Sequence, residues 1–456
     1  MTTFLERMNE YLVQKYPDGR GTAFSLTDGN DLPNGWLAQT PDIWGKSVDQ
    51  VKEGENGKVV VEDIRDLIAG ASNRVDVTTL AQFPDGEFLR GIQQGLVALA
   101  EQGRSTIDVR ILAGYPLAYR AKPSTYLEGL VEPLKSIKKG RLRIYVAAQR
   151  TGPSNVTWNH SKIVAVDGER ALVGGQNLWT QDYLKSAPVH DLNLRLEGPA
   201  VFDMHQFVNE IWKEVCGYSG KDWLPDLDWR PAYWETGLEK IRHDCLPDIN
   251  LGRKKPTGRG NMKVMGVGRY GRLKSDTMNP TDDAFVWAID QAKRQVCLSQ
   301  QDLLGPAGVG IWPAGINAIV NAIKRKCHVY VVVSNYHARS GSGNPYSNAW
   351  GSSPKATYEA VASHYSSEDV ALKDYLHVAS LRFGPSDEWK GGEKFANHAK
   401  FAMVDDEAFY VGSCNFYPSP LIEYSVFLED RGAIAHLNET YWNPLWQCSK
   451  RTLYCP

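Results

Sequence analysis

The sequence lacks the cysteine patterns of a structural zinc site. Its seven cysteines include no Cys-x-x-Cys pair, and no Cys/His cluster has zinc-finger spacing. Cys216 could pair with Cys245, and Cys448 with Cys455, but the odd total leaves at least one thiol free or intermolecular. A structural zinc site is therefore not expected.

Long apolar runs and a surplus of one charge are also missing. No stretch of roughly 20 apolar residues occurs, and residues 1–7 do not begin a basic and then apolar export signal. The 51 basic and 53 acidic residues leave a net charge of -2, which argues against a surface built throughout to bind nucleic acid. With 42% hydrophobic residues, the 456-residue chain has the composition of a folded protein of two or three domains.

An internal repeat divides the chain into two halves. Residues 159–167 and 173–177 correspond to residues 397–405 and 411–415, without a gap. A histidine, a lysine, an aspartate and an asparagine recur at a constant separation of 238 residues: His160 and His398, Lys162 and Lys400, Asp167 and Asp405, Asn177 and Asn415. A repeat of this kind predicts two structurally similar units.

Each half also has the same order of helix and strand patterns. Apolar residues at helical spacing over 92–99 and 316–323 are followed by short β-branched runs at 109–112 and 329–333, which are typical of buried parallel strands. We therefore expect an α/β protein with two similar α/β/α sandwich halves and the active site at their interface. The predicted boundaries are residues 1–216 for the first half, 217–262 for a connector and 263–456 for the second half.

The repeated histidines and lysines have side chains that could act together on a phosphoryl group. Two residues apart on a strand, His160 and Lys162 would share one face, as would His398 and Lys400. An imidazole can act as nucleophile, base or acid, and an ammonium can donate to a phosphoryl oxygen. Small residues before the repeated asparagines form turns that would let backbone and amide approach an anion closely. The small residues are Gly174, Gly175, Gly412 and Ser413, and the asparagines are Asn177 and Asn415.

The acidic residues divide into two groups. Asp167 and Asp405 lie five residues past their lysines, at the predicted start of a turn, so we expect structural hydrogen bonds from them. A catalytic imidazole works best when a carboxylate accepts from its other nitrogen. Asp191 and Glu423, which follow their respective histidines by 31 and 25 residues, are the candidates for this role.

At these residues the sequence resembles the phospholipase D superfamily. Both copies match the pattern H-x-K-(x)4-D-(x)6-G-[GS]-x-N, which marks that family. Further segments resemble the secreted bacterial phospholipases D, and these are residues 36–41, 158–162, 182–184, 188–192 and 409–419.

The resemblance implies a phospholipase D that works by two displacements without a metal or other cofactor. His160 would attack phosphorus to give a phosphohistidine, and His398 would protonate the leaving alcohol, such as choline. His398 would then activate water, giving phosphatidic acid, or a primary alcohol, giving transphosphatidylation. The implied partner is a phospholipid such as phosphatidylcholine at a membrane or micelle surface, with no nucleic acid. The resemblance also implies secretion, which no signal segment supports, and we expect a monomer.

Aromatic residues mark a predicted substrate loop. The segment 338–353 is rich in turn formers and holds Tyr346 and Trp350, and Trp179 lies beside the first motif. Aromatic side chains of this kind could meet a lipid surface, although an ordinary surface insertion is the alternative.

Other functions are less well supported. A nuclease of the same superfamily would use identical chemistry at phosphorus but should present a basic cleft. A catalytically silent lipid-binding protein would not need two complete His/Lys/Asn sets. The sequence Gly266 to Gly271 matches G-x-G-x-x-G, but no amphipathic helix follows it, so a dinucleotide site is not expected.

Overall fold

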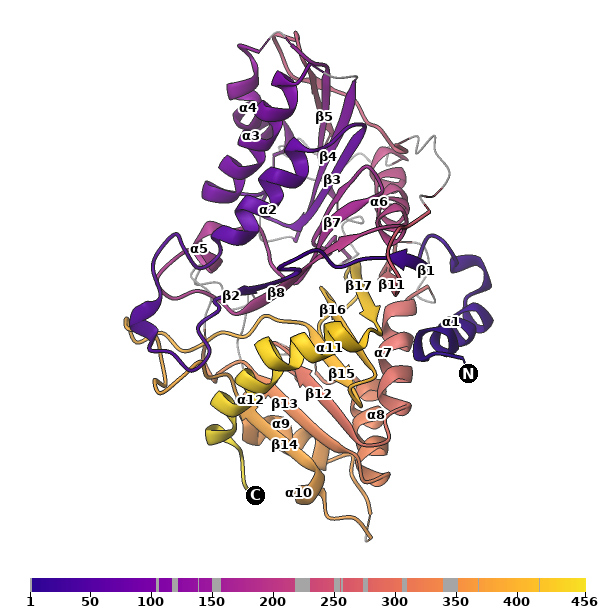
Figure 1. Cartoon of the computed structure of the whole chain (residues 1–456), viewed down its shortest axis with the longest axis vertical. Coiled ribbons are helices and arrows are strands. Elements are labelled where there is room, and N and C mark those ends of the chain that lie inside the picture. Colours follow the sequence, from indigo (N-terminus) through magenta and orange to yellow (C-terminus); the bar gives the residue numbers. More distant parts are fainter. Residues whose placement is uncertain are drawn as a thin grey trace.

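The computed structural model describes most of the chain. The described residues are 2–103, 106–116, 122–137, 139–149, 157–217, 230–249, 255, 257–273, 278–305, 310–338, 352–367, 369–417 and 419–456. Two large mixed sheets, one above the other in Figure 1, organise these residues.

The upper sheet has nine strands in the order β10-β9-β5-β4-β3-β6-β7-β8-β2. Strands β3, β4 and β5 are parallel, and the remaining neighbours pair antiparallel. The strands are β2 (Leu37–Thr40), β3 (Arg74–Leu80), β4 (Ile107–Gly114), β5 (Leu142–Gln149), β6 (Ile163–Val166), β7 (Arg170–Gly174), β8 (Asp191–Glu197), β9 (Ala232–Glu235) and β10 (Arg242–His243).

The lower sheet has eight strands in the order β1-β11-β17-β16-β15-β12-β13-β14. Here β12, β13 and β14 are the parallel strands. The strands are β1 (Phe24–Asn30), β11 (Met262–Arg269), β12 (Gln295–Ser299), β13 (His328–Val333), β14 (Leu376–Ser380), β15 (Phe401–Val404), β16 (Ala408–Gly412) and β17 (Glu423–Leu428).

Seven strands of each sheet follow the same order. The series β5-β4-β3-β6-β7-β8-β2 corresponds to β14-β13-β12-β15-β16-β17-β11, with the same parallel and antiparallel steps. The predicted strands 109–112 and 329–333 lie within β4 and β13 and are parallel to their neighbours. The expectation of two similar α/β halves is therefore confirmed.

Helices with regular apolar spacing cover the sheets. Apolar side chains at positions 60, 64 and 68 of α2 and 88, 92, 96 and 99 of α3 are fully buried, because this spacing places them on one face of each helix. The helices are α1 (Phe4–Lys15), α2 (Lys58–Ala69), α3 (Gly86–Glu101), α4 (Pro123–Val131), α5 (Thr180–Tyr183), α6 (Ala200–Gly217), α7 (Pro280–Asp290), α8 (Pro313–Lys324), α9 (Pro354–Ala362), α10 (Leu372–Tyr375), α11 (Arg431–Leu437) and α12 (Asn443–Ser449).

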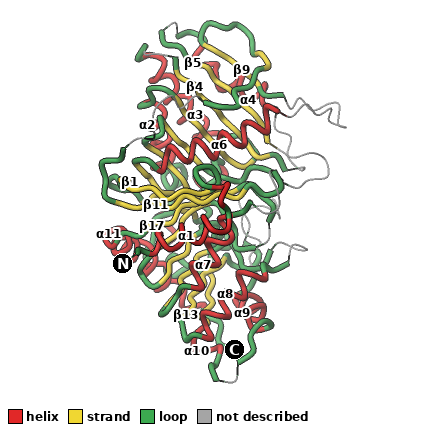
Figure 2. The backbone as a smooth tube through the Cα atoms, turned by 90° about the vertical axis from the view of Figure 1, so that its right-hand side faces the viewer, coloured by secondary structure: helices red, strands yellow, loops and turns green. Residues whose placement is uncertain are grey.

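The two sheets share structural elements across the predicted boundaries. Strand β1 pairs with β11 of the lower sheet, although it comes from the start of the chain, and β9 and β10 extend the upper sheet from within the predicted connector. Helix α6 packs against strands of both sheets, including β5, β6, β1 and β11 (Figure 2). The division at residues 216 and 262 stays a prediction. The sheets do not follow it strictly, because β1 of the first half joins the lower sheet and two strands of the connector join the upper sheet.

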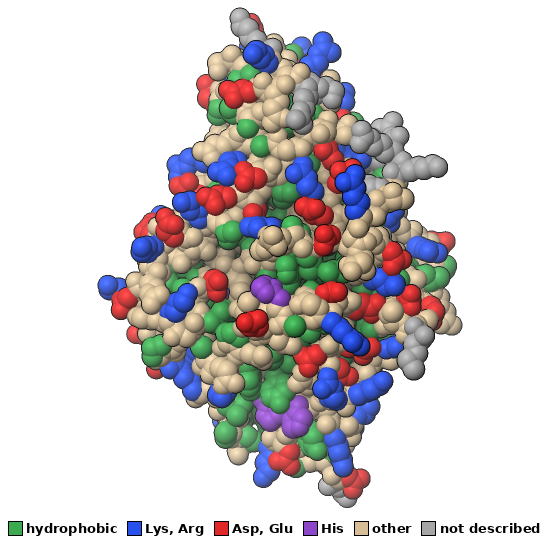
Figure 3. Space-filling view, in the orientation of Figure 1, with side chains coloured by type: hydrophobic (Ala, Val, Ile, Leu, Met, Phe, Trp, Pro, Cys, Tyr) green, Lys and Arg blue, Asp and Glu red, His purple; other side chains and the backbone are tan. Residues whose placement is uncertain are grey.

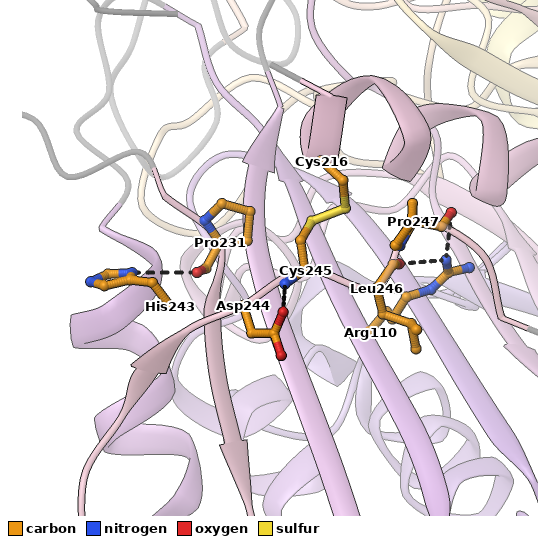
Figure 4. Close-up of a disulfide and its surroundings, with 8 residues drawn as sticks. All are labelled: Arg110, Cys216, Pro231, His243, Asp244, Cys245, Leu246 and Pro247. Atoms are coloured by element: carbon orange, nitrogen blue, oxygen red, sulfur yellow. Dashed lines mark hydrogen bonds between the residues drawn. A yellow bond between two sulfur atoms is a disulfide. The ribbon is translucent and has the colours of Figure 1, made fainter. Parts of the chain in front are cut away.

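One of the two candidate disulfides forms. Cys216, near the end of α6, is bonded to Cys245, with 5.6 Å between their Cα atoms (Figure 4). Beside it the Arg110 guanidinium donates to the main-chain oxygens of Leu246 and Pro247. Cys448 and Cys455 carry free thiols, so the second candidate pairing is wrong. The bridge and the arginine together hold the segment after β10 against α6 and the upper sheet.

Across the described parts of the chain, no helix combines the length and the apolar composition that spanning a membrane requires.

Candidate active site

The two motif histidines meet where the sheets adjoin. The rings of His160 and His398 lie 6.3 Å apart, centroid to centroid, and are inclined by 75°. His160 is 4% exposed and His398 2% exposed. Each histidine stands just before a short inner strand of its sheet, His160 before β6 and His398 before β15, so both lie at strand ends.

Two short backbone bridges join the two halves at these strand ends. The His160 amide donates to the carbonyl of Ile422 at 2.7 Å, immediately before β17. In the matching position, the His398 amide donates to the carbonyl of His190 at 2.7 Å, immediately before β8. Each motif is therefore anchored to the other half of the molecule.

The carboxylate partners are exchanged between the halves. Glu423 accepts a hydrogen bond from Nδ1 of His160 at 2.9 Å, and Asp191 accepts from Nδ1 of His398 at 2.7 Å. Both acids predicted to orient the histidines do so, but pairing of each acid with the histidine of its own half is wrong. The backbone bridges explain the exchange, because they place Asp191 and Glu423 directly beside the histidine of the opposite half.

These contacts determine the protonation of the first histidine. Burial lowers the pKa of His160 to about 4, and the nearby Lys162 charge adds to this, against the opposing effect of Glu423. Burial acts to raise the pKa of Glu423, but the charge and hydrogen bond of His160 outweigh it and hold that pKa at about 2. His160 is therefore neutral near pH 7, donates from Nδ1 to a carboxylate and keeps the lone pair of Nε2 free.

In the second pair the pKa of the carboxylate is raised, in contrast to that of Glu423, whereas the pKa of the histidine is again lowered. Burial raises the pKa of Asp191 to about 6, although Lys400 opposes the shift. Burial also lowers the pKa of the His398 imidazole well below its usual range, and the Lys400 charge adds to that effect. The Tyr183 hydroxyl donates to Asp191 at 2.9 Å and lies 3.3 Å from Nδ1 of His398. Asp191, His398 and Tyr183 are therefore coupled in their titration, and a proton bound by the His398–Asp191 pair belongs to the pair rather than to one residue.

Both motif lysines are buried at the same junction. The Lys162 ammonium donates to the carbonyl of His160, and the Lys400 ammonium to that of His398, each at 2.5 Å. Burial lowers the pKa of Lys162 well below its usual range and that of Lys400 to about 8. A bound phosphoryl anion would accept from the remaining N–H groups and stabilise the charged form of both lysines.

The motif asparagines carry unused hydrogen-bonding groups. Among the described residues, neither the amide nitrogen nor the oxygen of Asn177 has a partner, and the Asn415 oxygen has none, although both side chains are buried. Buried amides are normally paired. The amide nitrogen of Asn177 is therefore available to a ligand with hydrogen-bond acceptors, as phosphoryl oxygens are.

The small residues of the turns are required by the protein itself. A Cβ atom at Gly175 would lie 2.2 Å from Oδ1 of Asp191, and one at Gly412 would lie 2.0 Å from Oγ of Ser425. Ser413 is the exception, because its hydroxyl donates to Glu423 at 2.6 Å. Gly175 and Ser413 thus shape the contacts of the two carboxylates, and the close approach of the turns to an anion stays a prediction.

Asp167 and Asp405 are structural, as predicted. The Asp167 carboxylate accepts from the backbone amides of residues 72, 73 and 74 at 2.7–3.0 Å. The Asp405 carboxylate accepts from those of residues 293, 294 and 295 at 2.7–2.8 Å. Each aspartate closes the turn after its motif strand and fixes it to the start of the neighbouring strand.

The predicted substrate-loop residues are only partly described. Trp179 is 6% exposed and donates from Nε1 to the carbonyl of Gln82 at 3.0 Å, so it is packed in place. Tyr346 and Trp350 lie outside the described residues. The roles of Tyr183 and Ser413 in holding the carboxylates were not predicted, although Tyr183 falls in a segment that resembles the secreted phospholipases D. Within the described ranges, no cluster of three or more His, Cys, Asp or Glu side chains could hold a metal ion.

Comparison with known proteins identifies relatives along the whole chain. No family model matches it. The chain is 29% identical to a phospholipase D of Streptomyces antibioticus, over 100% of this chain and 89% of that protein. It is 28% identical to a cardiolipin synthase A of Pseudomonas putida over 41% of this chain and 37% of that protein. The crystal structure of a phosphatidylserine synthase from Haemophilus influenzae shares the fold, with a TM-score of 0.57 and 13% identity over 98% of this chain and 91% of that one.

Proposed function

Because the chain belongs to the phospholipase D superfamily, we propose that it is a phospholipase D that cleaves the distal phosphodiester bond of glycerophospholipids such as phosphatidylcholine. The observation that carries the proposal is the pair of histidines at the junction, each oriented by a carboxylate of the other half. The full-length similarity to a phospholipase D supports a phospholipid as substrate.

The first displacement forms a covalent intermediate. The lone pair of His160 Nε2 attacks phosphorus, and the bond between phosphorus and the head-group oxygen breaks. His398 gives its Nε2 proton to that oxygen, so the alcohol leaves neutral, and Asp191 stabilises the proton before transfer. Glu423 keeps the proton on Nδ1 of His160 as positive charge develops on the imidazole.

The second displacement returns the enzyme to its starting state. His398 takes a proton from water or from a primary alcohol, and the resulting oxygen attacks phosphorus while the bond to His160 breaks. Water yields phosphatidic acid, and an alcohol yields the exchanged phospholipid. Lys162, Lys400, Asn177 and Asn415 hold the phosphoryl oxygens in both steps. No step uses a metal ion or other cofactor.

A lipid substrate is favoured over a nucleic acid. Figure 3 shows acidic and basic side chains interspersed over one face of the molecule, without a continuous patch of one sign. A nuclease is expected to bind the phosphate backbone through clustered cations. The net charge of -2 agrees with this preference.

The proposed setting is a membrane or micelle surface outside the cell, with the chain acting as a monomer. The Cys216–Cys245 disulfide supports secretion, because such bonds persist mainly in oxidising compartments. Tyr346 and Trp350 are the proposed lipid-facing residues, and the buried Trp179 is proposed to support the substrate site from within the fold.

One assay tests the substrate and the reaction together. The protein is incubated with phosphatidylcholine and ethanol, and separately with single-stranded DNA. Choline release with formation of phosphatidylethanol is expected, and the DNA should stay intact. Cleavage of DNA without choline release would identify a nuclease, and binding of vesicles without turnover of either substrate would identify a silent lipid-binding protein.

A further inference from the structure

The G-x-G-x-x-G sequence at residues 266–271 has a structural place that the proposed mechanism does not use. Residues 266–269 form the end of β11, and β11 pairs antiparallel with β17. In this register Arg269, the last residue of β11, lies directly opposite Glu423, the first residue of β17. The motif therefore places Arg269 opposite the residue that orients His160, and the Arg269 charge acts to lower the pKa of Glu423.

Arg269 is buried, and its guanidinium contacts polar groups of three neighbouring residues. It is 3% exposed, and its Nη2 lies 2.9 Å from the Asp282 carboxylate of α7. The same nitrogen contacts the Cys414 sulfur, and Nη1 donates to the carbonyl of Ser419. Cys414 and Ser419 flank Asn415, so this side chain supports the loop that bears the motif asparagine.

Among the described residues, a neutral side chain occupies the matching place in the upper sheet. Its corresponding strands are β2 and β8, and there Thr40 lies opposite Asp191. Asp191 instead receives neutral donors, which are the Tyr183 hydroxyl and the Leu192 amide. The two histidine–carboxylate pairs are thus similar in geometry but differ in the charge behind the carboxylate.

We propose that Arg269 is a positioning residue for the His160–Glu423 pair: its guanidinium holds Glu423 as a carboxylate against His160 and fixes the Asn415 loop beside it. This inference rests on the proposed function, in which His160 is the nucleophile. A cation behind Glu423 keeps the shared proton on Nδ1 of His160, so that Glu423 remains the acceptor when positive charge develops on the ring.

Other charged groups also face Glu423, and they set the direction of the expected effects. They are His160 and Lys162 of the first motif, His398 and Lys400 of the second, Asp282 of α7, and the weaker acids Cys414, Tyr410 and Tyr417. Removing the Arg269 charge breaks the ion pair with Asp282 and removes a positive charge near the His160–Glu423 pair. Protonation of the His160–Glu423 pair should then become easier.

The test is the pH dependence of kcat/KM for Arg269→Met, Arg269→Lys and Asp282→Asn. Arg269→Met should move the acid limb of the profile upward by about 1 pH unit, as expected for loss of a neighbouring opposite charge. Arg269→Lys keeps the charge and should leave the acid limb near its wild-type position. Its kcat should be lower, because an ammonium lacks the planar set of donors that the guanidinium offers to Asp282 and the Asn415 loop. Asp282→Asn removes the ion pair but not the cation, so its limb should stay or move downward.

Two substrates separate this inference from the proposed function. Short-chain phosphatidylcholine tests the lipid reaction, and bis(p-nitrophenyl) phosphate tests phosphodiester chemistry without a lipid. If the wild type cleaves only the second, the lipid assignment fails and the Arg269 profiles still decide. If neither is cleaved, the pKa of His160 is followed in the resting protein by NMR of labelled histidine, assigned with His160→Gln, and it should rise in Arg269→Met.

The inference is overturned if Arg269→Met keeps the wild-type acid limb and the wild-type His160 pKa while losing only thermal stability. It is also overturned if Asp282→Asn shifts the limb upward as far as Arg269→Met, because the effect would then follow from loosened packing and not from the charge behind Glu423.

Discussion

Glu423 and His160 come from different halves of the chain, 263 residues apart, and form the 2.9 Å hydrogen bond that orients the proposed nucleophile. Asp191 and His398 repeat the relationship in the opposite direction. Neither half can complete a histidine–carboxylate pair alone. The active site therefore depends on correct docking of the two sheets, and both halves are expected to be inactive when separated.

Glu423→Gln should lower kcat by about 10²- to 10⁴-fold, since an amide cannot stabilise the imidazolium and can stabilise the wrong tautomer. The measurement is choline release from phosphatidylcholine. Glu197→Gln, the same change at an exposed position at the end of β8, is the control and should keep wild-type turnover. Equal turnover in Glu423→Gln and the wild type would contradict the orienting role.

Phosphate should be trapped on His160. During turnover of a phospholipid labelled with ³²P, rapid quenching and digestion under alkaline conditions should yield a labelled peptide that contains residue 160. The reason is the neutral imidazole of His160, whose pKa burial lowers to about 4. The His160→Ala protein is the control and should remain unlabelled. Label on the peptide containing His398 would reverse the roles of the two histidines.

The pH profile of kcat/KM should be bell-shaped, with its optimum between about 4 and about 6. His160 must be neutral to attack, so activity is lost as the pH falls through the His160 pKa of about 4. The His398–Asp191 pair must hold a proton for the leaving group, so activity is lost as the pH rises through the Asp191 pKa of about 6. A short-chain soluble phosphatidylcholine is the substrate. A profile that stays flat from pH 4 to pH 8 would refute this assignment.

Gly175→Ala should damage the second pair. A Cβ atom there would lie 2.2 Å from Oδ1 of Asp191, so the carboxylate must move away from His398. A loss of kcat of about 100-fold or more is expected. Gly129→Ala on α4, where a Cβ atom would meet no other atom within 4 Å, is the matched control and should keep full activity. Full activity in Gly175→Ala would show that Asp191 does not need its present position.

Replacing both Cys216 and Cys245 by serine should lower thermal stability with little change in kcat. The bridge closes a segment with a sequence separation of 29, and loops of this size contribute about 3–4 kcal/mol through the unfolded chain. Calorimetry measures the shift in midpoint, and Cys448→Ser, which removes a free thiol, is the control. An unchanged midpoint would show that the bridge does not stabilise the fold.

Much of the site could be predicted from the sequence, because the repeat marks it twice. The constant separation of 238 residues selects His160, Lys162, Asn177 and their counterparts, and the two-residue spacing on a strand places histidine and lysine on one face. The structural role of Asp167 and Asp405 also follows locally, since each falls at a turn directly after its motif strand. The two α/β halves follow from apolar periodicity, because burial on both faces of a parallel strand and on one face of a helix leaves a local pattern.

Only the tertiary structure decided which carboxylate serves which histidine. Sequence distance favours pairing within each half. The backbone bridges from His160 to Ile422 and from His398 to His190 instead join strand ends of the two halves and exchange the partners. The same limit applies to Arg269, whose place opposite Glu423 depends on a strand register between segments more than 150 residues apart. Periodicity records which face of an element is buried, whereas the residue on the opposing surface is set by how two folded halves pack, and no local pattern encodes that.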